Sequence, residues 1–152
     1  MTAEKVFPGN KKERCVYMNT EKFIKLTEND NFTVVSIPEV PDKGLVSSFN
    51  DFVHRELDCD LYESVYLRSI REHNIVMLVD ECGLLKNKRP NFFPWLFYSG
   101  LDLSAPIVGD VLFVSTHRVG ELQELDFCGL DQEQIDYLTK LFNQYLSIVN
   151  KK

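Results

Sequence analysis

Hydrophobic residues recur along the chain with two different periods, and the period predicts the type of each element. At helical spacing, one apolar stripe predicts a helix over about 45–58 and a second predicts a helix over about 131–149. Asp131 and Gln134 form an Asp-x-x-Gln capping box at the start of the second. The stripes comprise Leu45, Phe49, Phe52, Val53 and Leu57, then Ile135, Leu138, Leu141, Phe142, Tyr145 and Val149.

Shorter apolar runs, rich in β-branched residues and bounded by turn residues, predict strands. Phe32–Ile37 is one, and Tyr62–Ile70 with Ile75–Val79 is predicted to form an antiparallel hairpin. Gly83 is expected to supply an unusual backbone angle in the turn that follows, and Gly109 to mark a bulge or a close backbone approach. Further strands are predicted at Leu84–Leu85, Ile107–Val114 and Leu122–Cys128, with a turn over 117–121.

The order of these elements predicts the fold class. Strands precede and separate the two principal helices, which indicates an α+β fold with a mainly antiparallel sheet. A length of 152 residues suits one domain. We expect residues 31–152 to form this domain, and residues 1–30 to be an N-terminal extension that is loosely ordered or contributes an edge strand.

Charge and hydropathy narrow the class of partner. The formal net charge is −6, which argues against direct nucleic-acid binding through a broad basic face. The longest apolar runs are too short to cross a bilayer, and the N-terminus lacks the apolar core of a signal peptide. We therefore expect a cytoplasmic protein with no membrane partner, and reduced thiols at Cys15, Cys59, Cys82 and Cys128.

No motif in the sequence predicts catalysis, a metal or a cofactor. The histidines are too far apart for a local metal site, and there is no G-x-S-x-G, P-loop or dinucleotide-binding motif. A site scattered through the chain stays open as an alternative. It would bring together at least two of His54, His73, His117, Cys82 and the carboxylate pairs Asp58/Asp60, Asp80/Glu81 and Glu124/Asp126.

Residues 86–98 are the least ordinary part of the sequence. A basic cluster runs directly into an aromatic cluster, and two prolines disfavour a long helix or a central strand there. Cations with aromatics can hold a nucleotide by ion pairing and stacking, while the same aromatics could equally pack into the core. The candidate ligand- or partner-binding residues are Lys86, Lys88, Arg89, Asn91, Trp95 and Tyr98.

An ordered set of short motifs covers about residues 32–146. It comprises Asp80-Glu81-Cys82-Gly83, Asn91, Ile107-Val108-Gly109 before a strand, and Phe127-Cys128-Gly129-Leu130-Asp131-Gln132-Glu133-Gln134 at the last helix. In this order the motifs resemble domain-of-unknown-function family 3846, small proteins of phages, plasmids and conjugative elements. The resemblance implies a genomic setting, but no activity, cofactor or catalytic residue.

Three functions follow as hypotheses. The first is a non-enzymatic binding protein of a phage or mobile element that antagonises a host (defence) protein by protein–protein contact in the host cytoplasm, where acidic charge would mimic nucleic acid. The second is a small-ligand module that sequesters or senses a nucleotide through residues 86–98. The third is an enzyme with a scattered site.

Overall fold

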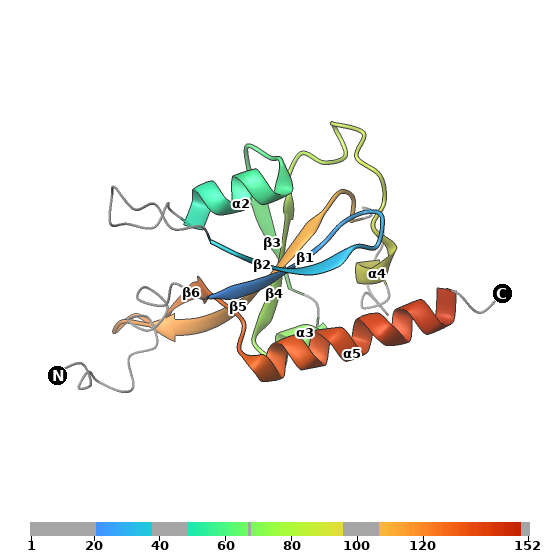
Figure 1. Cartoon of the computed structure of the whole chain (residues 1–152). Helices are drawn as coiled ribbons and strands as arrows, with labels where there is room; N and C mark the ends of the chain where they lie inside the picture. Colours follow the sequence, from blue (N-terminus) through green and yellow to red (C-terminus); the bar gives the residue numbers. More distant parts are fainter. Residues whose placement is uncertain (1–20, 38–48, 67, 96–106, 150–152) are drawn as a thin grey trace.

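The computed structural model describes residues 21–37, 49–66, 68–95 and 107–149 (Figure 1). The strands are β1 (Lys22–Leu26), β2 (Phe32–Ser36), β3 (Tyr62–Val65), β4 (Ile75–Asp80), β5 (Val111–Val119) and β6 (Glu124–Cys128). The helices are α2 (Phe49–Leu57), α3 (Arg68–Arg71), α4 (Phe92–Trp95) and α5 (Gln132–Val149). Among the described residues, no helix is long and apolar enough to cross a membrane.

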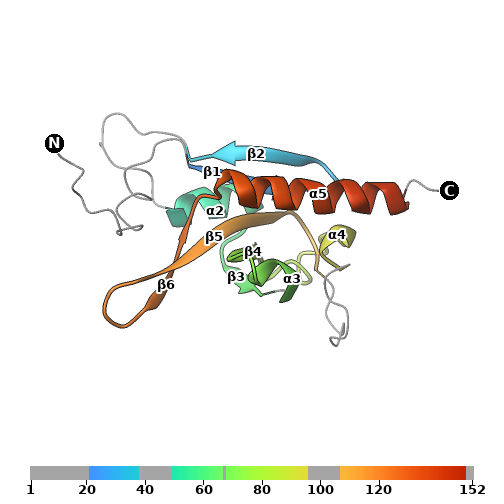
Figure 2. The same cartoon turned by 90° about the horizontal axis from the view of Figure 1, so that it is seen from below.

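Within the described residues, six strands form one sheet: five lie in the order β2-β1-β5-β4-β3, β6 pairs with β5, and every pairing is antiparallel. β6 pairs with the second half of β5, in the register His117 opposite Asp126, and the resulting ribbon projects away from the rest of the sheet (Figure 2). The predicted α+β class with a mainly antiparallel sheet is confirmed.

Helices cover both faces of the sheet, α5 on one side and α2 on the other (Figure 1). Successive strand residues point to opposite faces, so Met77 and Phe113 pack towards α5 while Leu78 and Leu112 pack towards α2. All six residues of β4 are buried, which is why its first five residues, Ile75–Val79, form an unbroken apolar run.

Both predicted principal helices are present. α2 lies within the predicted 45–58, of which residues 45–48 are outside the described residues. At α5 the capping box is complete: the Gln134 amide donates to Asp131 Oδ1 at 2.8 Å, and the Asp131 amide donates to Gln134 Oε1 at 2.9 Å. Two otherwise unsatisfied amides of the first turn are thereby paired, which fixes where the helix begins.

The predicted domain boundary at residue 30 is wrong for β1. This strand lies inside the sheet, between β2 and β5, and Phe23 and Ile24 are fully buried on opposite faces. A short strand that is covered on both faces lacks the polar–apolar alternation by which half-buried strands are found. Residues 1–20, including Cys15, are outside the described residues.

Three predicted strand and turn boundaries are also wrong. The strand over 62–70 ends at Val65 and is followed by α3. Leu84–Leu85 lies in a turn over 81–87, not in a strand. The predicted turn at 117–121 falls later, because β5 continues to Val119.

The two glycines singled out in the sequence have different roles. Gly83 does not adopt positive φ; Asn87, at φ 60°, supplies that angle in the loop. Gly83 instead allows close packing, since a Cβ there would lie 2.7 Å from Val108 Cγ2. Gly109 has φ +80°, and its amide donates to the Arg89 carbonyl at 2.7 Å, so of the two predicted roles the structure shows the close backbone approach.

Candidate functional site

A buried carboxylate at the end of β4 organises the loop that follows. The Asp80 side chain is 1% exposed, and its Oδ2 accepts from Lys86 Nζ at 2.9 Å and from Lys88 Nζ at 2.8 Å. Its Oδ1 accepts from the Cys82 amide at 2.9 Å. We call residues 81–88, held in this way, the anchored loop.

The same two lysines fasten the anchored loop to the end of α2. Lys88 Nζ donates to the carbonyl oxygens of Leu57 at 2.8 Å and Asp58 at 3.0 Å, and Lys86 Nζ reaches Asp58 O at 3.3 Å. Carbonyls at a helix C-terminus have no partner within the helix and carry partial negative charge, so they favour cations. Both ammonium groups therefore act within the fold.

Opposing effects set the protonation of this cluster. Burial alone would raise the pKa of Asp80, but the hydrogen bonds from Lys88, Lys86 and the Cys82 amide outweigh it and hold the pKa below the ordinary value. The hydrogen bond to Asp80 raises the pKa of Lys86, and the charges of Asp60 and Asp58 add to it. Asp80 and Lys86 thus both stay ionised around neutral pH.

The other predicted site residues are dispersed. Arg89 is exposed, and its amide donates to Glu28 Oε1 at 2.9 Å. Asn91 is fully buried and donates through Nδ2 to the carbonyls of Leu26, at 3.2 Å, and Gly109, at 2.9 Å. Trp95 belongs to α4, but its side chain, like the whole of Tyr98, is outside the described residues.

The aromatic part of the segment divides between core and surface. Phe93 is fully buried and makes edge-to-face contacts with Phe113, Phe142 and Tyr145. Its neighbour Phe92 is exposed. Core packing therefore explains Phe93, but not the whole cluster.

The anchored loop presents two adjacent leucines to solvent. Leu84 is 53% exposed and Leu85 is 85% exposed. Leu61, also exposed, directly precedes β3, and its carbonyl accepts from the amide of Glu81, the first residue of the anchored loop, at 3.0 Å. We call Leu61, Leu84 and Leu85 the leucine surface. Exposed carboxylates of Asp58, Asp60 and Glu81 belong to the same end of the sheet.

Sequence reasoning missed a second cluster, on the β5–β6 ribbon. His117 Nδ1 lies 3.2 Å from Cys128 Sγ, and His117 Nε2 lies 3.9 Å from Asp126 Oδ2. His117 and Asp126 were both named as possible members of a scattered site; Cys128 was not. The sequence could have predicted this pairing. If the strand is extended to residue 119 and a four-residue turn follows, the antiparallel register places residue 117 opposite residue 126.

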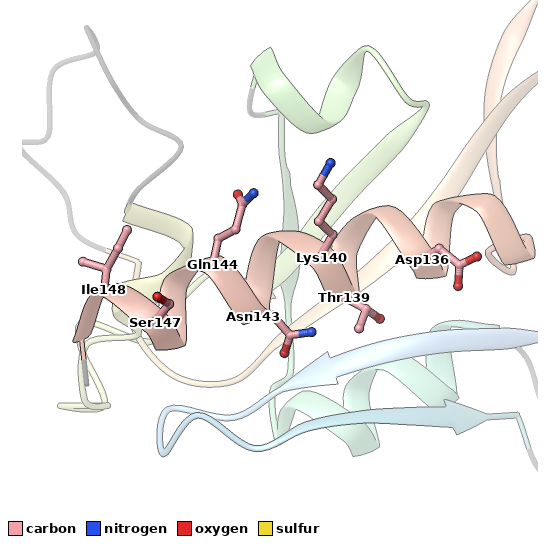
Figure 3. Close-up of a pocket in the computed structure, with 7 residues that line it drawn as sticks. All are labelled: Asp136, Thr139, Lys140, Asn143, Gln144, Ser147 and Ile148. Carbon is pink, nitrogen blue, oxygen red and sulfur yellow. The ribbon is translucent and has the colours of Figure 1, made fainter. Parts of the chain in front are cut away.

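Other features offer less chemistry. Among the described residues, Cys59, Cys82 and Cys128 are free cysteines, and the fourth predicted thiol, Cys15, is outside them. Within residues 21–37, 49–66, 68–95 and 107–149, no group of three His, Cys, Asp or Glu side chains could hold a metal ion. The described residues that line the hollow along α5 all belong to that helix, and Lys140 and Gln144 point away from Asp136 and Asn143 (Figure 3).

No family model, curated protein or solved structure matches this chain. The resemblance to family 3846 stays a prediction.

Proposed function

We propose that the protein is a non-enzymatic binding protein of a phage or other mobile element, and that it holds a host protein through the leucine surface. The observation that carries the proposal is the pair Leu84 and Leu85, exposed at the tip of a loop that a buried carboxylate fastens in place. The mobile-element setting rests on the family resemblance alone.

The anchored loop has the properties of a contact element. Exposed apolar residues are common singly, but here two exposed leucines are adjacent in the sequence, and the backbone of a third, Leu61, is hydrogen-bonded to Glu81, which begins the same loop. Burying a leucine side chain stabilises a complex by about 1.5–3 kcal/mol. Because Asp80, Lys86 and Lys88 already hold the loop, little conformational freedom is lost on binding, and more of that energy appears as affinity.

Charge around the leucine surface favours a basic partner. Asp58, Asp60 and Glu81 are exposed, while the charges of Lys86 and Lys88 are directed to Asp80. An acidic rim steers association with a positively charged surface. Proteins that bind nucleic acid carry such surfaces, which supports a host nuclease or another defence protein as the target.

The contacts of the lysines favour this function over the nucleotide module. A phosphate would have to draw Lys86 and Lys88 away from Asp80 and from the carbonyls that end α2. That exchange would leave a buried carboxylate unpaired, which is strongly unfavourable. Binding through the leucines leaves every one of these bonds intact.

Two variants test the proposal. Leu84→Ser together with Leu85→Ser removes the apolar surface, and Leu122→Ser, at an equally exposed leucine on the β5–β6 turn, is the matched control. We expect a bacterial partner, captured by the wild type and identified, to bind the double variant about 100-fold more weakly, since two buried leucines are lost. The control should bind as the wild type does. Isothermal titration measures both affinities.

The alternatives give different results. Equal binding by the double variant, with an unchanged melting temperature, would remove the leucine surface from the proposal. Concentration-dependent dimerisation that the double variant abolishes would assign the surface to a second copy of the chain. A nucleotide at about 100-fold its dissociation constant would stabilise the protein by about 2.7 kcal/mol, and such a thermal shift would favour the ligand module.

A further inference from the structure

The β5–β6 ribbon brings a thiol, an imidazole and a carboxylate into one row. His117 and Asp126 are directly opposite in the antiparallel register, and Cys128 follows two residues after Asp126, so all three side chains share a face. The distances are 3.2 Å from Cys128 Sγ to His117 Nδ1 and 3.9 Å from His117 Nε2 to Asp126 Oδ2.

The order of the row indicates proton transfer rather than metal binding. The thiol and the carboxylate approach opposite nitrogens of the imidazole, so one metal ion could not take all three as ligands. In the tautomer with its proton on Nε2, Nδ1 accepts the thiol proton and the Nε2–H faces Asp126. The resulting imidazolium would lie between a thiolate and a carboxylate, which both favour its charge.

Exposure along the row suits a small reactant. The His117 side chain is 7% exposed and the Asp126 side chain is 37% exposed. Cys128 is partly exposed, unlike the buried Cys59. A small molecule can therefore reach the sulfur while the imidazole stays shielded from bulk water.

The backbone beside the thiol argues against acyl transfer. Acyl transfer needs amide donors that hold an oxyanion near the nucleophile. The Gly129 amide, which follows Cys128 directly, already donates to Glu21 Oε1 at 2.6 Å. Exchange between sulfurs forms no oxyanion and needs no such donor.

We infer that Cys128 is a reactive thiol that exchanges with low-molecular-weight disulfides, with His117 as its base and Asp126 as a positioning residue. His117 Nδ1 takes the proton of the thiol, and Sγ attacks one sulfur of the disulfide. The disulfide bond breaks, a mixed disulfide to Cys128 forms, and the departing thiolate takes the proton back from the imidazolium. The inference goes beyond the proposed binding function and does not depend on it.

The charged groups near Cys128 and His117 affect how readily a proton passes from the thiol to the imidazole. Besides His117 and Asp126, the Glu21 carboxylate lies beside Gly129. Burial raises the pKa of Glu21; the hydrogen bond from Gly129 opposes this, and the charge of Asp126 adds to it. The Asp126 carboxylate, 3.9 Å from His117 Nε2, favours the imidazolium form of His117.

The first test compares cysteines within the wild-type chain. The reduced protein is incubated with oxidised glutathione at pH 7, quenched with acid, and each cysteine-containing peptide is measured by mass spectrometry. We expect Cys128 to form the mixed disulfide about tenfold faster than Cys82, which is partly exposed in its turn, since an imidazole neighbour increases the thiolate fraction. Equal rates at Cys128 and Cys82 would overturn the inference, whatever the variants show.

The second test separates proton transfer from structure. In His117→Asn, alkylation of Cys128 by iodoacetamide should fall about tenfold at pH 6.5 and regain the pH profile of an ordinary thiol. Asp126→Asn should lower the rate less, and Glu124→Gln, which removes an exposed carboxylate of the same strand opposite Val119, should leave it unchanged. An unaltered pH profile in a folded His117→Asn variant would show that the contact only supports the ribbon.

Discussion

Two clusters at opposite ends of the sheet combine a carboxylate with basic side chains, and they differ in how far the carboxylate is buried and paired. In the anchored loop, Asp80 is almost completely buried and holds both Lys86 and Lys88 at hydrogen-bonding distance. On the β5–β6 ribbon, Asp126 is partly exposed and lies 3.9 Å from His117, beyond hydrogen-bonding distance. The first carboxylate is bound within the fold, whereas the second still has access to solvent.

The difference shows which polar residues a fold leaves available for function. A charge that is removed from water must be paired, and its partners are then committed to it. The charges of Lys86 and Lys88 are therefore used to hold the anchored loop. The surface that this loop presents to a partner is formed by the neighbouring leucines. His117 and Cys128 make a contact that the sheet does not require, because backbone pairing already joins their strands.

The largest expected effect is at the buried carboxylate. Asp80→Ala leaves Lys86 and Lys88 without their shared partner, and we expect the free energy of unfolding to fall by about 3–5 kcal/mol. Urea denaturation followed by circular dichroism measures the change. A loss below about 1 kcal/mol would mean that the carbonyls at the end of α2 are enough to hold both lysines, and the contrast between the two clusters would fail.

Measurements at acidic pH test whether the charge of Asp80 is the cause of this loss of stability. The pKa of Asp80 is lowered from its ordinary value of 3.8, so its ionised form stabilises the folded state. This contribution is present above about pH 3.8 and is lost as pH falls through the folded pKa. The stability difference between wild type and Asp80→Asn should therefore narrow in acid; a difference independent of pH would point to lost packing instead.

An intermediate effect is expected at the buried amide of the same segment. Asn91→Ala leaves the carbonyls of Leu26 and Gly109 without their side-chain donor, and should lower the free energy of unfolding by about 1–3 kcal/mol. Arg89→Ala is the matched control, because the arginine is exposed and its described bond uses the backbone amide. In urea denaturation, the free energy of unfolding of Arg89→Ala should lie within about 0.5 kcal/mol of the wild-type value. Equal losses in both variants would contradict this assignment.

The sequence was informative wherever one local pattern decided the structure. The stripe of α5 and its Asp131–Gln134 cap predict the helix because both lie within a few turns of the chain. The sequence does not predict β1, because a strand buried on both faces shows no alternation of polar and apolar residues. Leu84–Leu85 is wrongly predicted as a strand, because two apolar residues are too few to show either a strand period or a helix period.

The sites depend on contacts that sequence spacing does not reveal. The basic composition of Lys86 and Lys88 was visible, but their acceptors at Leu57 and Asp58 come from a helix about 30 residues earlier. The row of His117, Asp126 and Cys128 depends on the register of β5 and β6, and a shift of one residue would move a side chain to the other face.

The smallest expected effect is at the ribbon carboxylate. Asp126→Ala removes a partly exposed carboxylate whose Oδ2 lies 3.9 Å from His117 Nε2, and even a fully charged pair at such a site contributes about 0–1 kcal/mol. It also removes a negative charge that raises the pKa of Glu21, so the loss of attraction to His117 is partly offset. We expect the free energy of unfolding to stay within about 0.5 kcal/mol of wild type in urea denaturation. A loss as large as that of Asp80→Ala would show that the ribbon carboxylate is also part of the structural framework. An unchanged stability would leave the row His117, Asp126 and Cys128 as a set of groups that the fold positions without depending on them.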